Sequence, residues 1–240
     1  MKPNTGVPIS PETGIPGWLT DEEEKQLIRY ALEVPPEGVI VEIGSEYGRS
    51  AGAFLLGCDP TVKVASVDLF PVDHPVVGDL RVTFESNLVE AGYQDANRVA
   101  FRASSEVVAA RWKGPIDLLF IDGDHTYEGA SRDIKVWSGY VRPKGLMLIH
   151  DVANGPQSHP LHFEVLRAIN ELVSEDEWTL EHKIDSLRVY RRRPHADKNM
   201  EQPLSGAAAE PDERDSDGGT PPTEADAPVR VRVRRKRGSS

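Results

Sequence analysis

Three features are scarce in this sequence, and each scarcity excludes a class of protein. Its 240 residues include one cysteine, Cys58, so no internal disulfide can form. This agrees with a reducing compartment. No apolar run approaches the roughly 18 residues of a membrane span, and the first residues lack the apolar core of a signal peptide. We therefore expect a cytoplasmic protein with no membrane partner.

Positive charge is also scarce, except at the end of the chain. The sequence has 28 Lys and Arg against 39 Asp and Glu, a formal net charge of -11, so the body is a poor match for nucleic acid. Gly, Pro, Ala, Ser and acidic residues dominate from Glu201 to Pro228, and basic residues gather at 229–237. We predict a disordered linker with a basic C-terminal tail over 195–240. A weak nucleic-acid contact through this tail stays open, but we favour a solvated tail.

Composition sets apart two further segments. Residues 1–17 contain four prolines and three glycines, which predicts an extended N-terminal arm. Residues 18–194 have the length of one substantial α/β domain. At its start, Trp18 is expected to pack on the first helix rather than to border a ligand.

Apolar strands alternate with amphipathic helices over residues 18–194. A capping box from Thr20 to Glu23 opens the first helix. The predicted strands are 39–43, 62–68, 98–101, 116–121 and 146–149, followed by an antiparallel pair, 178–182 and 186–191. The later predicted helices are 79–91, 107–112, 127–140 and 162–172, with residues 143–145 as a turn. This alternation predicts an α/β fold with a doubly wound, mostly parallel seven-stranded sheet.

A glycine turn follows the first strand. Residues 39–43 end in Glu42 and Ile43, and Gly44 and Gly48 come next, before an apolar helix. Glycine lets the backbone turn sharply and lets a ligand approach the free N–H groups of the helix end. An ordinary strand–turn–helix connection has the same pattern. The second strand ends in Asp68, however, where a carboxylate can bind ribose hydroxyls.

Polar residues follow every parallel strand of the predicted sheet. They are Glu42 and Gly44, Asp68, Ser104, Asp122, and the pair His150 and Asp151. The carboxyl ends of parallel strands meet at one edge, where such sheets bind their ligands. We therefore predict one ligand site there rather than five separately solvated loops.

Two motifs resemble those of a known enzyme family. The spacing of Glu42, Gly44 and Gly48 resembles motif I of class I S-adenosylmethionine (SAM)-dependent methyltransferases, which have a Rossmann-like sheet. The block Ile-Asp-Gly-Asp-His-Thr-Tyr at 121–127 and the pair His150-Asp151 resemble the methyltransferase type 24 family. That family includes relatives of sugar O-methyltransferases from antibiotic pathways. The resemblance covers roughly residues 38–152.

The resemblance implies SAM as the methyl donor. The turn from Gly44 would hold the methionine part through backbone N–H groups, and Asp68 would bind the ribose. Ser104 or Ser105 would bond the adenine edge, and Leu69 or Phe70 would pack on the ring. The full set expected to bind the cofactor is Glu42, Gly44, Ser45, Tyr47, Gly48, Ser50, Asp68, Leu69, Ser104, Ser105 and Asp122.

Similar O-methyltransferases hold a divalent cation, which implies Asp122, His150 and Asp151 as ligands here, with Asp124 as an alternative to His150. Carboxylates suit Mg²⁺, and a histidine shifts the preference toward Mn²⁺ or Zn²⁺. Val152 stands where the catechol-type enzymes have Asn, so a metal requirement stays open. We predict His125 as general base beside Asp122. The alternative is a histidine that bonds a loop carbonyl or caps the next helix.

The function that these residues predict is SAM-dependent O-methylation of a small hydroxylated, sugar-like acceptor. A hydroxylase-like or NAD-dependent enzyme of similar fold is an alternative, disfavoured because G-x-G-x-x-G is absent from the glycine turn. A non-catalytic nucleotide-binding module with a nucleic-acid-binding tail is another. A homo-oligomer is left open.

Overall fold

The computed structural model describes residues 6–194. The predicted linker and basic tail, 195–240, lie outside the described residues. No helix among the described residues is long and apolar enough to cross a membrane.

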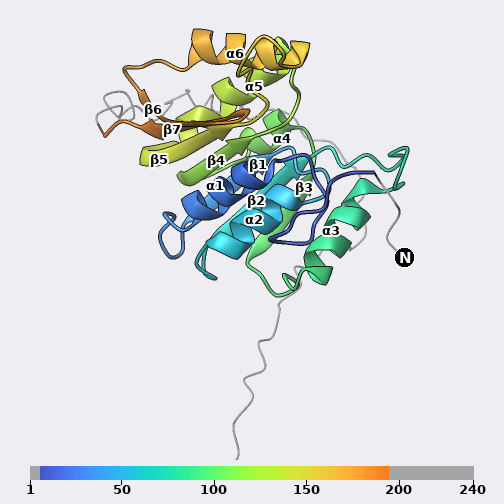
Figure 1. The fold of residues 1–240 in the computed structure, drawn as a ribbon. Helices are drawn as coiled ribbons and strands as arrows, with labels where there is room; N and C mark the ends of the chain where they lie inside the picture. The colour runs from blue at the N-terminus through green and yellow to red at the C-terminus, as the bar shows by residue number, and fades with distance from the viewer. Residues whose placement is uncertain (1–5, 195–240) are drawn as a thin grey trace, which may run out of the picture. The chain divides into compact units, whose positions relative to one another are not determined.

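The centre of the fold is a seven-stranded sheet in the order β3-β2-β1-β4-β5-β7-β6 (Figure 1). The strands are β1 Val39–Ile43, β2 Lys63–Asp68, β3 Arg98–Arg102, β4 Ile116–Ile121, β5 Val141–Ile149, β6 Trp178–Ile184 and β7 Leu187–Arg192. The first five pair in parallel, and β7 pairs antiparallel with both β5 and β6. The predicted fold class is confirmed. The strand order reverses between β1 and β4, so a crevice opens beyond their carboxyl ends.

Helices cover both faces of the sheet because its inner strands are apolar on both sides. They are α1 Asp21–Ala31, α2 Arg49–Gly57, α3 Leu80–Glu90, α4 Ser105–Ala109, α5 Tyr127–Trp137 and α6 Pro160–Leu172. Alternate residues of β1 enter different cores: Val41 packs with α5 residues such as Trp137, whereas Ile40 packs with Leu27 of α1 and Phe54 of α2. This is the burial expected of a central parallel strand.

Several element boundaries differ from the predictions. Strand β5 begins at Val141 rather than at Leu146, and it includes residues 143–145, which we predicted as a turn. The pairing of β4 with β5 is irregular near Ile116, so Pro143 does not have to donate to a regular ladder. Helix α4 begins earlier than predicted, at Ser105. Helix α5 ends at Trp137 and continues as a 3₁₀ turn, 138–140.

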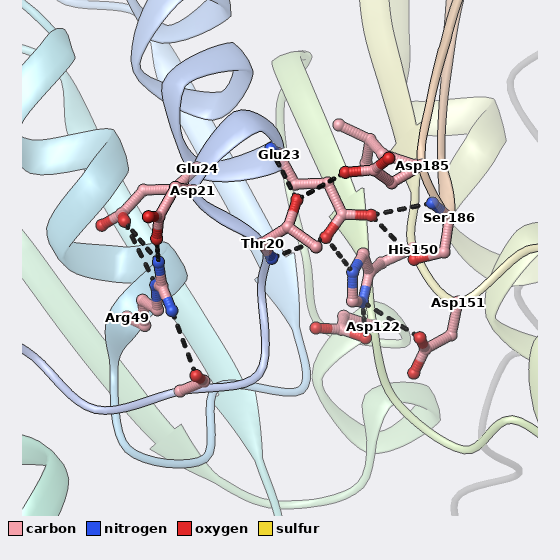
Figure 2. Close-up of polar contacts among 12 residues, drawn as sticks. Thr20, Asp21, Glu23, Glu24, Arg49, Asp122, His150, Asp151, Asp185 and Ser186 are labelled. Carbon is pink, nitrogen blue, oxygen red and sulfur yellow. Dashed lines mark hydrogen bonds and ion pairs between the residues drawn. The ribbon is translucent and has the colours of Figure 1, made fainter. Parts of the chain in front are cut away.

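The N-terminal segment differs from the predicted extended arm. The N–H of Gly17 donates to the carbonyl of Pro8 at 3.0 Å, so residues 8–17 fold back on themselves. Ile15 is buried. Arg49 donates to the Gly17 carbonyl at 3.2 Å and forms a buried ion pair with Glu24 at 2.8 Å (Figure 2). One charged side chain therefore ties this segment to α1 and α2, which composition does not reveal.

We predict that Gly57→Ala destabilises the fold. A Cβ there would lie 2.2 Å from the carbonyl oxygen of Ile28, so α1 and α2 would have to move apart. Such overpacking costs about 1–3 kcal/mol of unfolding free energy, measurable by urea denaturation. Gly155→Ala is the matched control, because its Cβ would meet nothing within 4 Å. Equal stability of the two variants would contradict the predicted packing.

Candidate active site at the carboxyl edge of the sheet

A cavity of about 590 Å³ lies at the carboxyl ends of the parallel strands. Its walls include most of the residues predicted from the strand ends. Those predicted residues are Gly44, Ser45, Tyr47, Ser50, Asp68, Leu69, Ser104, Ser105, Asp122, His125, His150 and Asp151. The five strand ends therefore border one space.

The first wall is the glycine turn between β1 and α2. Gly44 has φ +85°, and a Cβ there would lie 2.0 Å from the carbonyl oxygen of Asp122. A side chain is thus excluded by the backbone conformation and by the closeness of the β4 end. Gly48 has φ +93° and faces Phe84 of α3. It does not line the cavity, so its part is to shape the turn.

Asp68 at the end of β2 holds the glycine turn. Its Oδ2 accepts the N–H groups of Ser45 at 2.8 Å and Glu46 at 3.1 Å. Its Oδ1 accepts the N–H of Phe70 at 2.7 Å. We predicted that N–H groups of this turn would face the cofactor, but these two face Asp68. Phe70 is buried in the core, which leaves Leu69 as the apolar side chain on the cavity.

Glu42 lies behind the turn and does not line the cavity. Its side chain is fully buried, and Ser50 Oγ donates to its Oε2 at 2.6 Å. Burial raises the pKa of Glu42 to about 7, although Ser50 and neighbouring serines oppose the shift. Glu42 therefore supports the turn from within, rather than binding a ligand directly.

Ser104 and Ser105 lie where β3 leads into α4. Both line the cavity, and Ser105 Oγ donates to Asp133 Oδ1 of α5. Asp133 also lines the cavity and is buried. Sequence reasoning missed Asp133, because one carboxylate within an amphipathic helix carries no distinguishing signal.

A chain of charged groups joins α1 to the end of β4, and its members Glu23 and His150 are buried. His150 Nδ1 lies 3.0 Å from Asp122 Oδ1, and His150 Nε2 lies 3.1 Å from Glu23 Oε2. Glu23 also accepts the backbone N–H and the hydroxyl of Ser186 at 2.9 and 2.8 Å. Figure 2 shows His150 between the two carboxylates. Glu23 was predicted only as a helix-capping residue, so its part in the site was missed.

These contacts fix the charges of the chain. Burial alone would lower the pKa of His150, but the charge of Asp122 and the contacts with both carboxylates raise it well above its ordinary value. Burial would raise the pKa of Glu23 and of Asp122, yet His150 brings each down to about 2. The chain is therefore carboxylate, imidazolium, carboxylate near neutral pH.

His125 and Asp151 complete the cluster on the cavity side. His125 Nε2 lies 3.4 Å from Asp122 Oδ1 and 3.3 Å from Asp151 Oδ2. His162, at the start of α6, places Nε2 3.1 Å from Asp151 Oδ1. One ligand atom each from Asp122, His125 and Asp151 lies within 4.8 Å of the others.

The structure differs from the predicted set of metal ligands in one residue, His150. Both of its ring nitrogens contact carboxylates, so the imidazole has no nitrogen free for a cation. His125, which we predicted as a general base, lies between Asp122 and Asp151, where a third metal ligand would be expected. The donor set of two carboxylates and one imidazole fits a divalent cation.

Trp18 also differs from its predicted packing role. Its side chain lines the cavity and is 63% exposed. The indole N–H donates to Glu46 Oε1 at 3.4 Å. Trp18 therefore borders the cavity instead of packing on the first helix.

Comparison with known proteins gives a family match and structures of similar fold. Residues 41–152 match a family model described as a methyltransferase domain. A protein from Corynebacterium glutamicum has a TM-score of 0.60 at 14% identity, over 78% of this chain and 84% of its own. The methyltransferase PaMTH1 from Podospora anserina, bound to SAH, has a TM-score of 0.59 at 17% identity, with 73% and 80% covered. An O-methyltransferase from Bacillus cereus in complex with SAH has a TM-score of 0.56 at 15% identity, with 73% and 83% covered.

We predict that Glu42→Gln changes how stability depends on pH. The folded-state pKa of about 7 lies above the ordinary value of 4.5, so the wild type loses stability as pH rises across this interval. Gln cannot ionise. The unfolding free energy of Glu42→Gln relative to wild type should therefore rise between pH 5 and pH 8, by at most about 3 kcal/mol.

Urea denaturation at the two pH values measures this change. Glu175→Gln, at an exposed position, is the control and should show no such rise. A difference between Glu42→Gln and wild type that is the same at both pH values would contradict a buried, protonated Glu42.

Proposed function

We propose that the chain transfers a methyl group from SAM to a hydroxyl oxygen of a small, sugar-like acceptor. The match of residues 41–152 to a family model described as a methyltransferase domain supports the transfer of a methyl group. The observation that carries this proposal is the single cavity bordered by all five parallel strand ends. Its volume of about 590 Å³ is within the range of small-molecule sites, about 300–1,000 Å³. The SAH bound by two similar proteins supports the choice of donor.

The donor would lie along the strand ends. Asp68 uses three acceptor positions for backbone N–H groups, and a carboxylate offers about four, so room remains for a ribose hydroxyl. Leu69 is exposed beside it and can pack on the adenine ring. Ser104 lies one strand further along the edge and can bond a polar adenine edge. Gly44 lets the methionine part approach the β1–α2 turn.

The acceptor would approach from the mouth near Trp18 and His125. In the reaction the hydroxyl loses its proton, the O–CH₃ bond forms as the C–S bond breaks, and SAH leaves without the sulfonium charge. The chain's task is to hold donor and acceptor in line, because methyl transfer needs no covalent help from the protein.

We propose that Asp122 and Asp151 hold a divalent cation during this step. A cation bound there would lower the pKa of the acceptor hydroxyl and fix its direction. The base role of His125 stays a prediction. Contact with Asp122 raises the pKa of His125 despite the opposing effect of burial, so the imidazole would act as a base only above that raised value.

The function is tested by incubating the full chain with SAM and a panel of free sugars, nucleotide sugars and catechols. We expect a mass gain of one methyl group on a sugar hydroxyl. Methylation confined to catechols would contradict the sugar-like acceptor. Failure of SAH to bind the protein would contradict the donor assignment itself.

We predict that Asp68→Ala weakens SAH binding. Hydrogen bonds to a charged group contribute about 1.5–3 kcal/mol each, so loss of the ribose contact should raise the Kd at least about tenfold. Isothermal titration calorimetry with SAH measures the change. Asp73→Ala, on an exposed loop, should leave the Kd unchanged. An unaltered Kd in Asp68→Ala would contradict the ribose role.

A further inference from the structure

We infer that His125, and not His150, is the third protein ligand of the cation site with Asp122 and Asp151, and that it makes the site select Mn²⁺ over Mg²⁺. The inference rests on the proposed function for the presence of a cation. It goes beyond that function by naming the imidazole that binds the ion and the class of ion bound.

The spacing of the donor atoms is the first argument. His125 Nε2 lies 3.4 Å from Asp122 Oδ1 and 3.3 Å from Asp151 Oδ2. Adjacent ligands of an octahedral ion at about 2.1 Å are separated by about 3 Å. The ligand atoms of Asp122, His125 and Asp151 all lie within 4.8 Å of one another, so these three residues are close enough to be donors to one ion.

The contacts of His150 are the second argument, because they remove the competing ligand. Its Nδ1 contacts Asp122 and its Nε2 contacts Glu23, and both His150 and Glu23 are almost fully buried. Turning the ring toward the cavity would leave Glu23 as a buried carboxylate without its partner, which is strongly unfavourable. Figure 2 shows this ring enclosed between Glu23 and Asp122.

Histidines behind the carboxylates give the third argument. His150 contacts Asp122 Oδ1 at 3.0 Å, and His162 contacts Asp151 Oδ1 at 3.1 Å. Each carboxylate thus has a neighbouring imidazole that orients it, which is the usual arrangement around metal ligands. His125 differs from His150 in exposure, because its side chain is 30% exposed beside the cavity whereas that of His150 is 4% exposed.

The chemistry of the donor set decides which ion is selected. Mg²⁺ strongly prefers oxygen ligands and retains its waters. Mn²⁺ also suits carboxylates but, unlike Mg²⁺, is a first-row transition ion and belongs to the series whose affinities for mixed nitrogen and oxygen sites are ranked. A site with one imidazole and two carboxylates should therefore discriminate in favour of Mn²⁺. A His125 bound to the ion could not also accept a proton, so this inference replaces the base role predicted for that residue.

The test uses MnCl₂ alone with the full chain, without SAM or acceptor. Pulsed electron paramagnetic resonance should detect ¹⁴N modulation from an imidazole bound to Mn²⁺, and His125→Asn should abolish it. Calorimetry should show that His125→Asn weakens Mn²⁺ binding by at least about tenfold, the smallest effect of losing even an outer partner. The affinity of His125→Asn for Mg²⁺ should change less, so the ratio of its Mn²⁺ affinity to its Mg²⁺ affinity should fall below that of the wild type.

Two controls make the result specific. His74→Gln removes a loop histidine that does not line the cavity and should keep both the ¹⁴N signal and the Mn²⁺ affinity. His162→Gln should keep the ¹⁴N signal while weakening Mn²⁺ binding. Thermal unfolding of each variant verifies that it is folded.

Three outcomes would overturn the inference. They are absence of ¹⁴N modulation in the wild type, its persistence in His125→Asn, or an unchanged ratio of Mn²⁺ to Mg²⁺ affinity in that variant. A parallel titration with SAH separates this failure from failure of the proposed function. Normal SAH binding without ¹⁴N modulation would reject the ligand role of His125 and leave the methyltransferase assignment intact.

Discussion

The contact between Glu23, His150 and Asp122 is the constraint on which the site depends. It places an imidazolium between two carboxylates, with Glu23 and His150 almost fully buried. Removing one partner of such a buried pair costs about 3–5 kcal/mol, although the pair itself adds little net stability. Its consequence is geometric: α1 and the end of β5 together fix Asp122. The edge of the cavity therefore depends on a helix outside the residues matched by the family model, 41–152.

Backbone crowding sets the other side of the same site. Gly44 lies so close to the carbonyl of Asp122 that no side chain fits between them, and the N–H of Asp122 donates to the Ile43 carbonyl at 2.8 Å. The ends of β1 and β4 are thus held together directly. Asp68 then holds the glycine turn from β2. A donor bound at this edge would meet groups that are already ordered, which reduces the entropy lost on binding.

The sequence predicted the sheet and its polar edge because apolar runs mark where each parallel strand ends. Gly44, Asp68 and Asp122 were placed in this way, and all three line the cavity. Glu23 could not be placed at the site from the sequence, because its capping box already explains a carboxylate at that position. Its contact with His150 also joins residues 127 positions apart. The family resemblance implied His150 as a ligand of the cation. Motif spacing does not show which way a histidine ring is turned, so the sequence could not correct this.

We propose that the ends of five parallel strands bind one adenosyl nucleoside. A crystal structure of the full chain with saturating SAH tests it most directly. We expect density along the cavity, with the ribose hydroxyls within hydrogen-bond distance of Asp68 and the sulfur nearest to the end of β4. Density for SAH elsewhere on the protein, or a cavity that contains solvent alone at saturating SAH, would contradict the account.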